Sequence, residues 1–219
     1  MAKDFTFNPE RVNIWVNDIN NCLNGEEPSL YRSCVLFNEQ LQKLVQPDVW
    51  TGSAAARNYQ AFVETHNIMV DFINLFSSVF KEKMSYITYE LMDMENDKYF
   101  YDYSILNMFG VLNYNNLKKL SEQNINKSII RYDYNTISAI KNALNIIFDD
   151  LTEVRKTLEG KLEVLNDNTG LWDGSAALNA KEDLSNLLKT NMDKIFEHLD
   201  TCINNIELAL ENAKSVDNM

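Results

Sequence analysis

Apolar side chains recur along this chain at alternating intervals of four and three residues. In the first half, the positions with this spacing are Leu30, Cys34, Phe37, Leu41 and Leu44, and then Tyr59, Phe62, His66, Met69, Ile73, Phe76 and Phe80. In the second half they are Ile140, Leu144, Ile147, Leu151, Val154 and Leu158, and then Leu184, Leu188, Met192, Ile195, Leu199, Cys202 and Ile206. The pattern is a heptad seam on one face of a helix. Since thirty helical residues span about 45 Å, the four seams favour a bundle of long rods.

One short sequence occurs twice, each time between two seams. Residues 50–55 read Trp-Thr-Gly-Ser-Ala-Ala, and residues 172–177 read Trp-Asp-Gly-Ser-Ala-Ala. A turn repeated with matching flanks predicts a duplicated helical hairpin. In each turn we expect a buried Trp whose indole N–H satisfies a helix-end carbonyl, and a Gly that permits a backbone conformation closed to other residues. Ser53 and Ser175 are candidate N-caps for the helices that follow.

Start and stop signals set the boundaries of the two hairpins. Asn8 and Pro9 form a helix start, and residues 25–28 (Gly-Glu-Glu-Pro) interrupt the first helix. The stretch Phe-Thr-Phe-Asn at 5–8 resembles Tyr-Asp-Tyr-Asn at 132–135, which matches Asn8 with Asn135. These signals predict a first hairpin at residues 1–95, a connector at 96–131 and a second hairpin at 132–219.

The connector, residues 96–131, is rich in aromatic and aliphatic residues, so we expect it to pack. An antiparallel pair of hairpins requires a connection as long as the bundle, and about 35 residues suffice at ~1.5 Å each as helix or ~3.3 Å each as extended chain. The predicted fold is therefore all-α: an elongated antiparallel four-helix bundle of two fused helix-turn-helix hairpins. The two Trp turns lie at opposite ends, and the connector runs along the outside.

Composition narrows the classes of partner. The 219 residues carry a net charge of −12, 45% hydrophobic residues, 6 Gly and 3 Pro. An acidic surface repels phosphate groups, so nucleic acid and anionic membranes are not expected partners. Stable membrane insertion is not expected either, because no apolar segment approaches the roughly 18 residues needed to span a bilayer. Residues 1–8 lack the apolar stretch of a Sec signal peptide, which predicts synthesis in the cytoplasm.

The sequence offers few candidate residues for catalysis or metal binding. His66 and His198 are the only histidines, and His66 sits on a seam, where a satisfied core histidine is expected. No HExxH, glycine-rich phosphate loop or nucleophile elbow occurs. We therefore expect no enzyme activity and no cofactor. Cys22, Cys34 and Cys202 are expected as free thiols, with a Cys22–Cys34 bridge across the break as the alternative.

The two turns resemble the WXG motif of the ESAT-like substrates of bacterial type VII (ESX) secretion systems. The matching residues are Trp50 and Gly52 in the first hairpin and Trp172 and Gly174 in the second. The resemblance covers most of the chain except the connector. It implies helical hairpins that pair antiparallel, here fused into a monomeric pseudo-dimer, and export of the folded protein without a Sec signal. It also implies recognition by the secretion ATPase where one hairpin's turn lies beside the other's tail, with other helical-hairpin proteins as further partners.

The export signal of that family is Tyr-x-x-x-Asp/Glu on the tail after the second helix. Tyr89 and Asp93 match it, and Tyr86 with Glu90 forms an overlapping match. A spacing of four places both side chains of a pair on one helix face. The tail of the second hairpin has Glu211 and no tyrosine.

The leading functional expectation is a secreted, non-enzymatic substrate of a type VII system. The alternative is a cytosolic adaptor or chaperone that binds another helical hairpin and is not exported. A third interpretation is a structural coiled-coil protein unrelated to secretion.

Overall fold

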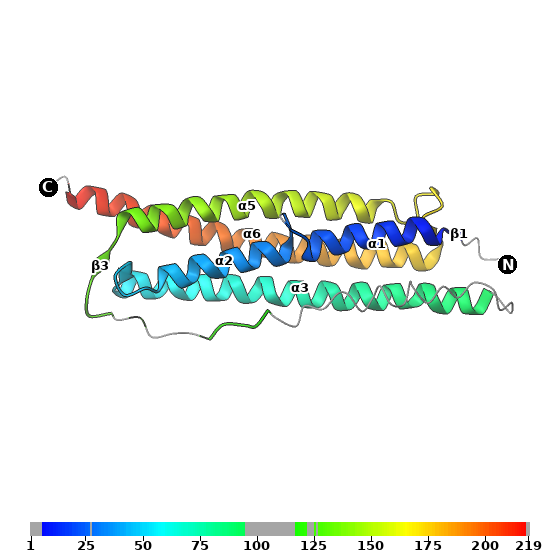
Figure 1. Ribbon diagram of the computed structural model, residues 1–219, viewed down its shortest axis with the longest axis horizontal. Helices are drawn as coiled ribbons and strands as arrows, with labels where there is room; N and C mark the ends of the chain where they lie inside the picture. Colours follow the sequence, from blue (N-terminus) through cyan, green and yellow to red (C-terminus); the bar gives the residue numbers. More distant parts are fainter. Residues whose placement is uncertain (1–5, 27, 95–116, 122–124, 126, 218–219) are drawn as a thin grey trace.

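The computed structural model describes residues 6–26, 28–94, 117–121, 125 and 127–217. This part of the chain is mostly α-helical, as predicted, and its helices run along one long axis (Figure 1). The helices are α1 (Pro9–Asn24), α2 (Leu30–Leu44), α3 (Ser53–Met94), α5 (Tyr134–Glu163) and α6 (Ser175–Asp217). The strands are β1 (Thr6–Phe7), β2 (Trp50–Thr51), β3 (Arg131–Tyr132) and β4 (Trp172–Asp173).

The four predicted seams form the core. Every residue named above for a seam is buried, including the polar His66 at 2% exposure. Full burial of a Leu, Ile, Val, Phe or Met side chain contributes about 1.5–3 kcal/mol relative to its exposure. The four-three spacing therefore identified correctly which face of each long helix is turned inward.

The predicted interruption of the first helix is confirmed, and it divides that helix into α1 and α2. A Cβ on Gly25 would lie 2.5 Å from the carbonyl oxygen of Asn21, so a larger residue does not fit without a shift of backbone. Ser29 then restarts the helix: its hydroxyl donates to the carbonyl of Gly25 at 2.9 Å and accepts from the amide of Arg32 at 3.1 Å. The result is two helical segments in succession, where the second hairpin has the single helix α5.

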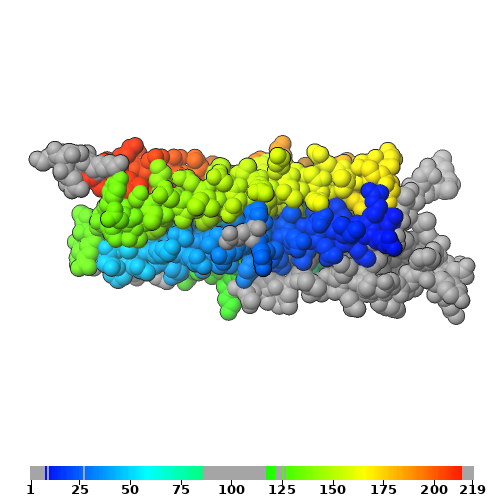
Figure 2. Space-filling view, turned by 45° about the horizontal axis from the view of Figure 1, so that its top comes forward, coloured from blue at the N-terminus to red at the C-terminus, as the bar shows by residue number. Residues whose placement is uncertain are grey.

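Contacts between the second helices of the two hairpins show that these helices are antiparallel. In the first half of α3, the hydroxyl of Thr65 lies 3.4 Å from the sulfur of Cys202, in the second half of α6. Further along α3, the ammonium of Lys83 lies 2.5 Å from the carboxylate of Asp183. Rising numbers on α3 thus meet falling numbers on α6. On the face seen in Figure 2, α1 and α2 lie alongside α5.

A tryptophan outside the two repeated turns joins α1 to α5. The indole N–H of Trp15 donates to the carbonyl of Lys161 at 2.6 Å, in the last turn of α5, and its ring lies 5.6 Å from that of Phe80. The ammonium of Lys161 also pairs with Asp18 at 2.5 Å. The sequence assigned this kind of indole bond to the Trp turns. That assignment is wrong for Trp172, whose buried Nε1 has no hydrogen-bond partner.

The buried cysteines and histidine also differ in part from expectation. Cys22, Cys34 and Cys202 are all free, so the alternative Cys22–Cys34 bridge is not formed. Burial raises the pKa of Cys34 and of Cys202 to about 12. Burial lowers the pKa of His66. Its Nδ1 is buried without a hydrogen-bond partner, so the prediction of a fully hydrogen-bonded histidine is wrong for this atom.

The Trp15 hydrogen bond can be tested with a matched pair of substitutions. Trp15→Phe leaves the carbonyl of Lys161 without its donor, whereas Trp172→Phe removes an N–H that has no partner. We expect Trp15→Phe to lower the free energy of unfolding by about 1–2 kcal/mol more than Trp172→Phe does, as measured by urea denaturation. Equal losses in the two variants would mean that ring volume, and not the hydrogen bond, sets the cost.

Candidate functional site

The candidate site consists of the two Trp turns, and in both of them the Trp side chain is buried. Trp50 is 4% exposed and Trp172 is 1% exposed. The residue before each is buried as well, at 3% for Val49 and 4% for Leu171. Both turns therefore close their hairpins as packed structural elements, and a partner molecule would not contact the indole rings directly.

The glycine of each turn caps the helix that follows. Gly52 has φ of 107° and Gly174 has φ of 123°, a region that other residues rarely adopt. The carbonyl of Gly52 accepts from the amide of Ala56, and that of Gly174 from the amide of Leu178, each at 3.0 Å. The prediction of serine N-caps is therefore wrong, because both serines are the first residues inside α3 and α6. The carbonyl of each glycine accepts the first hydrogen bond of its helix, as the carbonyl of an N-cap residue does.

Each turn is paired with the entry strand of the other hairpin. Strand β1 pairs antiparallel with β4, with Phe7 opposite Trp172, and β3 pairs antiparallel with β2, with Tyr132 opposite Trp50. Figure 1 shows the two strand pairs at opposite ends of the long axis. The Trp50 and Trp172 turns therefore lie at opposite ends of the described structure, each paired with an entry strand in a way that the sequence did not predict.

The residue after each entry strand continues the pairing and caps a helix. The amide of Asn8 donates to the carbonyl of Leu171 at 3.1 Å, and the amide of Asp133 donates to the carbonyl of Val49 at 2.7 Å. Asn8 caps α1, and Asp133 caps α5. The structural counterpart of Asn8 is therefore Asp133, two positions before the Asn135 that the sequence comparison matched to it.

The cap at Asp133 also has an electrostatic effect. Its carboxylate accepts from the backbone amides of Asn135 and Thr136 at 3.0 and 3.2 Å, and from the hydroxyl of Thr136 at 2.6 Å. These hydrogen bonds, the hydroxyl first among them, lower the pKa of Asp133. An ionised carboxylate at the N-terminus of α5 also faces the positive end of the helix dipole.

At the first turn, Trp50 and Thr51 contact residues 129–132, where the connector meets the second hairpin. The ring of Tyr132 meets that of Trp50 edge-on at 5.9 Å. The hydroxyl of Thr51 donates to the carbonyl of Ile129 at 2.6 Å. The hydroxyl of Tyr132 is buried without a partner, and burial raises the pKa of Tyr132 to about 12. The shape of this end therefore depends on the connector.

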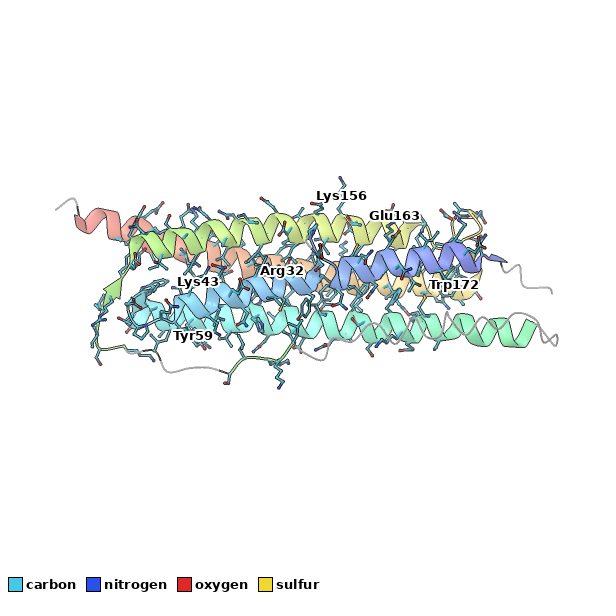
Figure 3. The ribbon with its side chains drawn as sticks, in the orientation of Figure 1. Arg32, Lys43, Tyr59, Lys156, Glu163 and Trp172 are labelled. Carbon is cyan, nitrogen blue, oxygen red and sulfur yellow. The ribbon has the colours of Figure 1, made fainter. Side chains whose placement is uncertain are left out.

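At the second turn, beside the Trp172 labelled in Figure 3, further hydrogen bonds form within the loop itself. The carboxylate of Asp173 accepts from the amides of Asn168 and Gly170 at 2.9 and 3.1 Å. The side-chain oxygen of Asn166 accepts from the amide of Gly174 at 2.9 Å. Asp173 occupies the position of Thr51, so the one residue that differs between the repeated hexapeptides gives the two turns different supports.

The candidate export signal lies in the last turns of α3. Helix α3 continues to Met94, so Tyr89 and Asp93 are both helical. Figure 1 shows this end of α3 at the same end of the molecule as β1, which pairs with the turn strand β4. The side chains of both residues, and those of the overlapping pair Tyr86 and Glu90, lie outside the described part of the structure.

The tail of the second hairpin has different chemistry. Phe196 and Asp200 have the spacing of the signal, but Phe196 packs on Phe148 with ring centroids 4.9 Å apart. The guanidinium of Arg155 lies 5.9 Å from the centroid of the same ring. Phe196 is therefore a packing residue along α6.

The described residues contain no group of three or more His, Cys, Asp or Glu side chains arranged to hold a metal ion. No helix among them is both long and apolar enough to cross a membrane.

Comparison of the chain with known protein families, with curated proteins and with solved structures gives no match.

The glycine conformations lead to a prediction with an internal control. Gly52→Ala and Gly174→Ala each place a Cβ at a positive φ, so we expect each to lower the free energy of unfolding by about 1–3 kcal/mol. Gly160 lies inside α5, and a Cβ there meets nothing within 4 Å. Gly160→Ala should therefore stabilise the protein by about 0.5–1 kcal/mol. Thermal and urea unfolding measure all three variants, and a stabilising Gly52→Ala would contradict the role of its conformation.

Proposed function

We propose that this chain is an antiparallel four-helix bundle of two fused WXG-type hairpins, which makes it an intrachain pseudo-dimer. The reciprocal pairing of β1 with β4 and of β2 with β3 supports this arrangement. So do the antiparallel contacts of α3 with α6 and the burial of all four seams. Two separate hairpins that exchanged the same strand pairs would form the corresponding dimer.

We further propose that the protein is a non-enzymatic substrate or partner protein of a bacterial type VII secretion system, exported without a Sec signal. The observation that carries this proposal is the make-up of one end of the molecule. There the Trp172 turn of the second hairpin shares an end with the last turns of α3, which contain Tyr89 and Asp93. In the family that the motifs resemble, such a composite end is what the secretion ATPase recognises.

The two composite ends differ in a way that favours recognition of one of them. The end with the Trp50 turn is matched with the tail of α6, where Glu211 stands and no tyrosine follows. Counted from the two tryptophans, Glu211 is the position equivalent to Tyr89. A receptor that reads a Tyr and an acid one helical turn apart would therefore bind the Trp172 end.

Export of point variants tests the proposal. We expect the wild type to appear in the medium of a type VII-competent strain, while Tyr89→Ala and Asp93→Ala reduce export at least tenfold. Glu211→Ala is the matched control: it changes the equivalent position on the other tail, so export should stay at the wild-type level. Quantitative immunoblots of medium and cells measure the ratio, with the cellular level of each variant as the check on folding.

Retention of the wild type in the cell would contradict the secretion proposal. Retention together with a copurified helical-hairpin protein would favour the cytosolic adaptor or chaperone. Equal export of Tyr89→Ala and wild type would remove this signal while leaving the fused-hairpin architecture untouched.

A further inference from the structure

Part of the connector lies along α3 in the opposite direction to that helix. Residues 117–121 have no helical or strand conformation, and Leu117, Leu120 and Ile125 pack against the core. Polar contacts follow in reverse order along α3. On α3 they are Lys119 with Asp71, Leu120 with Asn67, and Ser121 with Tyr59. Ile129 continues this order at Thr51 in β2, just before α3. The connector is therefore held at several points along one helix.

The most specific of these contacts is made by Asn67. Its Oδ1 accepts from the amide of Leu120 at 2.8 Å, and its Nδ2 donates to the carbonyl of the same residue at 3.0 Å. One side chain thus satisfies both backbone groups of one residue, as a neighbouring β-strand would. An extended segment without such a partner would leave these groups to water.

The other contacts are also directed at the backbone. Tyr59, labelled on α3 in Figure 3, donates to the carbonyl of Ser121 at 3.5 Å. Thr51 donates to the carbonyl of Ile129 at 2.6 Å. Hydrogen bonds to the main chain give affinity for any extended segment, while pockets for side chains give specificity.

Specificity comes from the two leucines more than from charge. Leu117 and Leu120 are partly buried against the core. The ammonium of Lys119 lies 2.7 Å from the carboxylate of Asp71, but both side chains are 58% exposed. An exposed ion pair contributes roughly 0–1 kcal/mol and is weakened by salt.

We propose that α3 carries a binding face for an extended peptide, centred on Asn67, and that the chain's own residues 117–121 fill it as an internal ligand. The ligand class is an extended segment with the pattern Leu-Lys-Lys-Leu, bound through its backbone and its leucines. Because the ligand is tethered to the site, its effective concentration is high, and a free peptide competes poorly with it. This proposal is independent of whether the protein is secreted.

Displacement of the internal ligand tests the site. The double variant Lys119→Glu/Leu120→Pro removes the exposed ion pair, one leucine side chain and the backbone N–H of residue 120, which donates to Asn67. A fluorescent peptide with the wild-type sequence of residues 115–125 should bind this variant at least tenfold tighter than it binds wild-type protein, as measured by anisotropy. Adding Asn67→Ala should abolish the gain, and adding Asn74→Ala, an exposed asparagine on the same helix, should preserve it. No gain in the displaced variant, or a gain that survives Asn67→Ala, would overturn the proposal.

A second measurement uses the intact chain and does not require the displaced variant to fold. The amide of Leu120 should exchange with deuterium at least tenfold faster in Asn67→Ala than in wild type. Asn74→Ala should leave its exchange rate unchanged. An exchange rate that is insensitive to Asn67→Ala would show that this side chain does not hold the segment, and would refute the proposed site.

Discussion

The reciprocal strand pairing at the two ends fixes the register on which the rest of the structure depends. A heptad seam is repetitive, so a slip of seven residues would again bring apolar positions face to face. Such a slip moves one helix by about 10 Å. The hydrogen bonds from Asn8 to Leu171 and from Asp133 to Val49 each join the two halves of the chain, one at either end of the molecule. A slip of one half along the other would therefore break both bonds. The short strands therefore exclude registers that the long seams alone would tolerate.

The seams, the break and the turns could be predicted because their signals are local. Apolar spacing reports which helix face is buried whatever that face packs against. The break at Gly25 and the turns at Gly52 and Gly174 follow from what a Cβ would do to the nearby backbone. The choice of Asp133 over Asn135 as a cap is different in kind. Asp and Asn are about equally good caps, so the choice depends on which backbone amide reaches Val49, a residue distant in sequence.

Long-range polar contacts could not be predicted from the sequence either, because they also depend on residues that are distant in sequence. Trp15 and Lys161 are 146 positions apart, and neither stands in a motif. Trp172 does stand in a repeated motif, yet its indole N–H is buried without a hydrogen-bond partner. Leaving that group unpaired costs about 1–3 kcal/mol, whereas losing a Trp ring from a core costs about 3–5 kcal/mol. Packing therefore outweighs the lost hydrogen bond, and a tryptophan is stable there without one.

The duplication is symmetric in its backbone and asymmetric in its side chains. Both turns have the same strand, the same glycine conformation and the same pairing, but Thr51 reaches to the connector and Asp173 folds back on its own loop. Among the described residues, the Trp50 turn thus gains a hydrogen bond to the connector at Ile129, whereas Asp173 gives the Trp172 turn hydrogen bonds within its own loop. Two independent features distinguish the two ends for a receptor. One is the set of contacts that Thr51 or Asp173 makes at the turn, and the other is the residues of the adjoining helix tail. Because both turns are in one chain, a substitution can change one end alone while the other end and the core keep their residues.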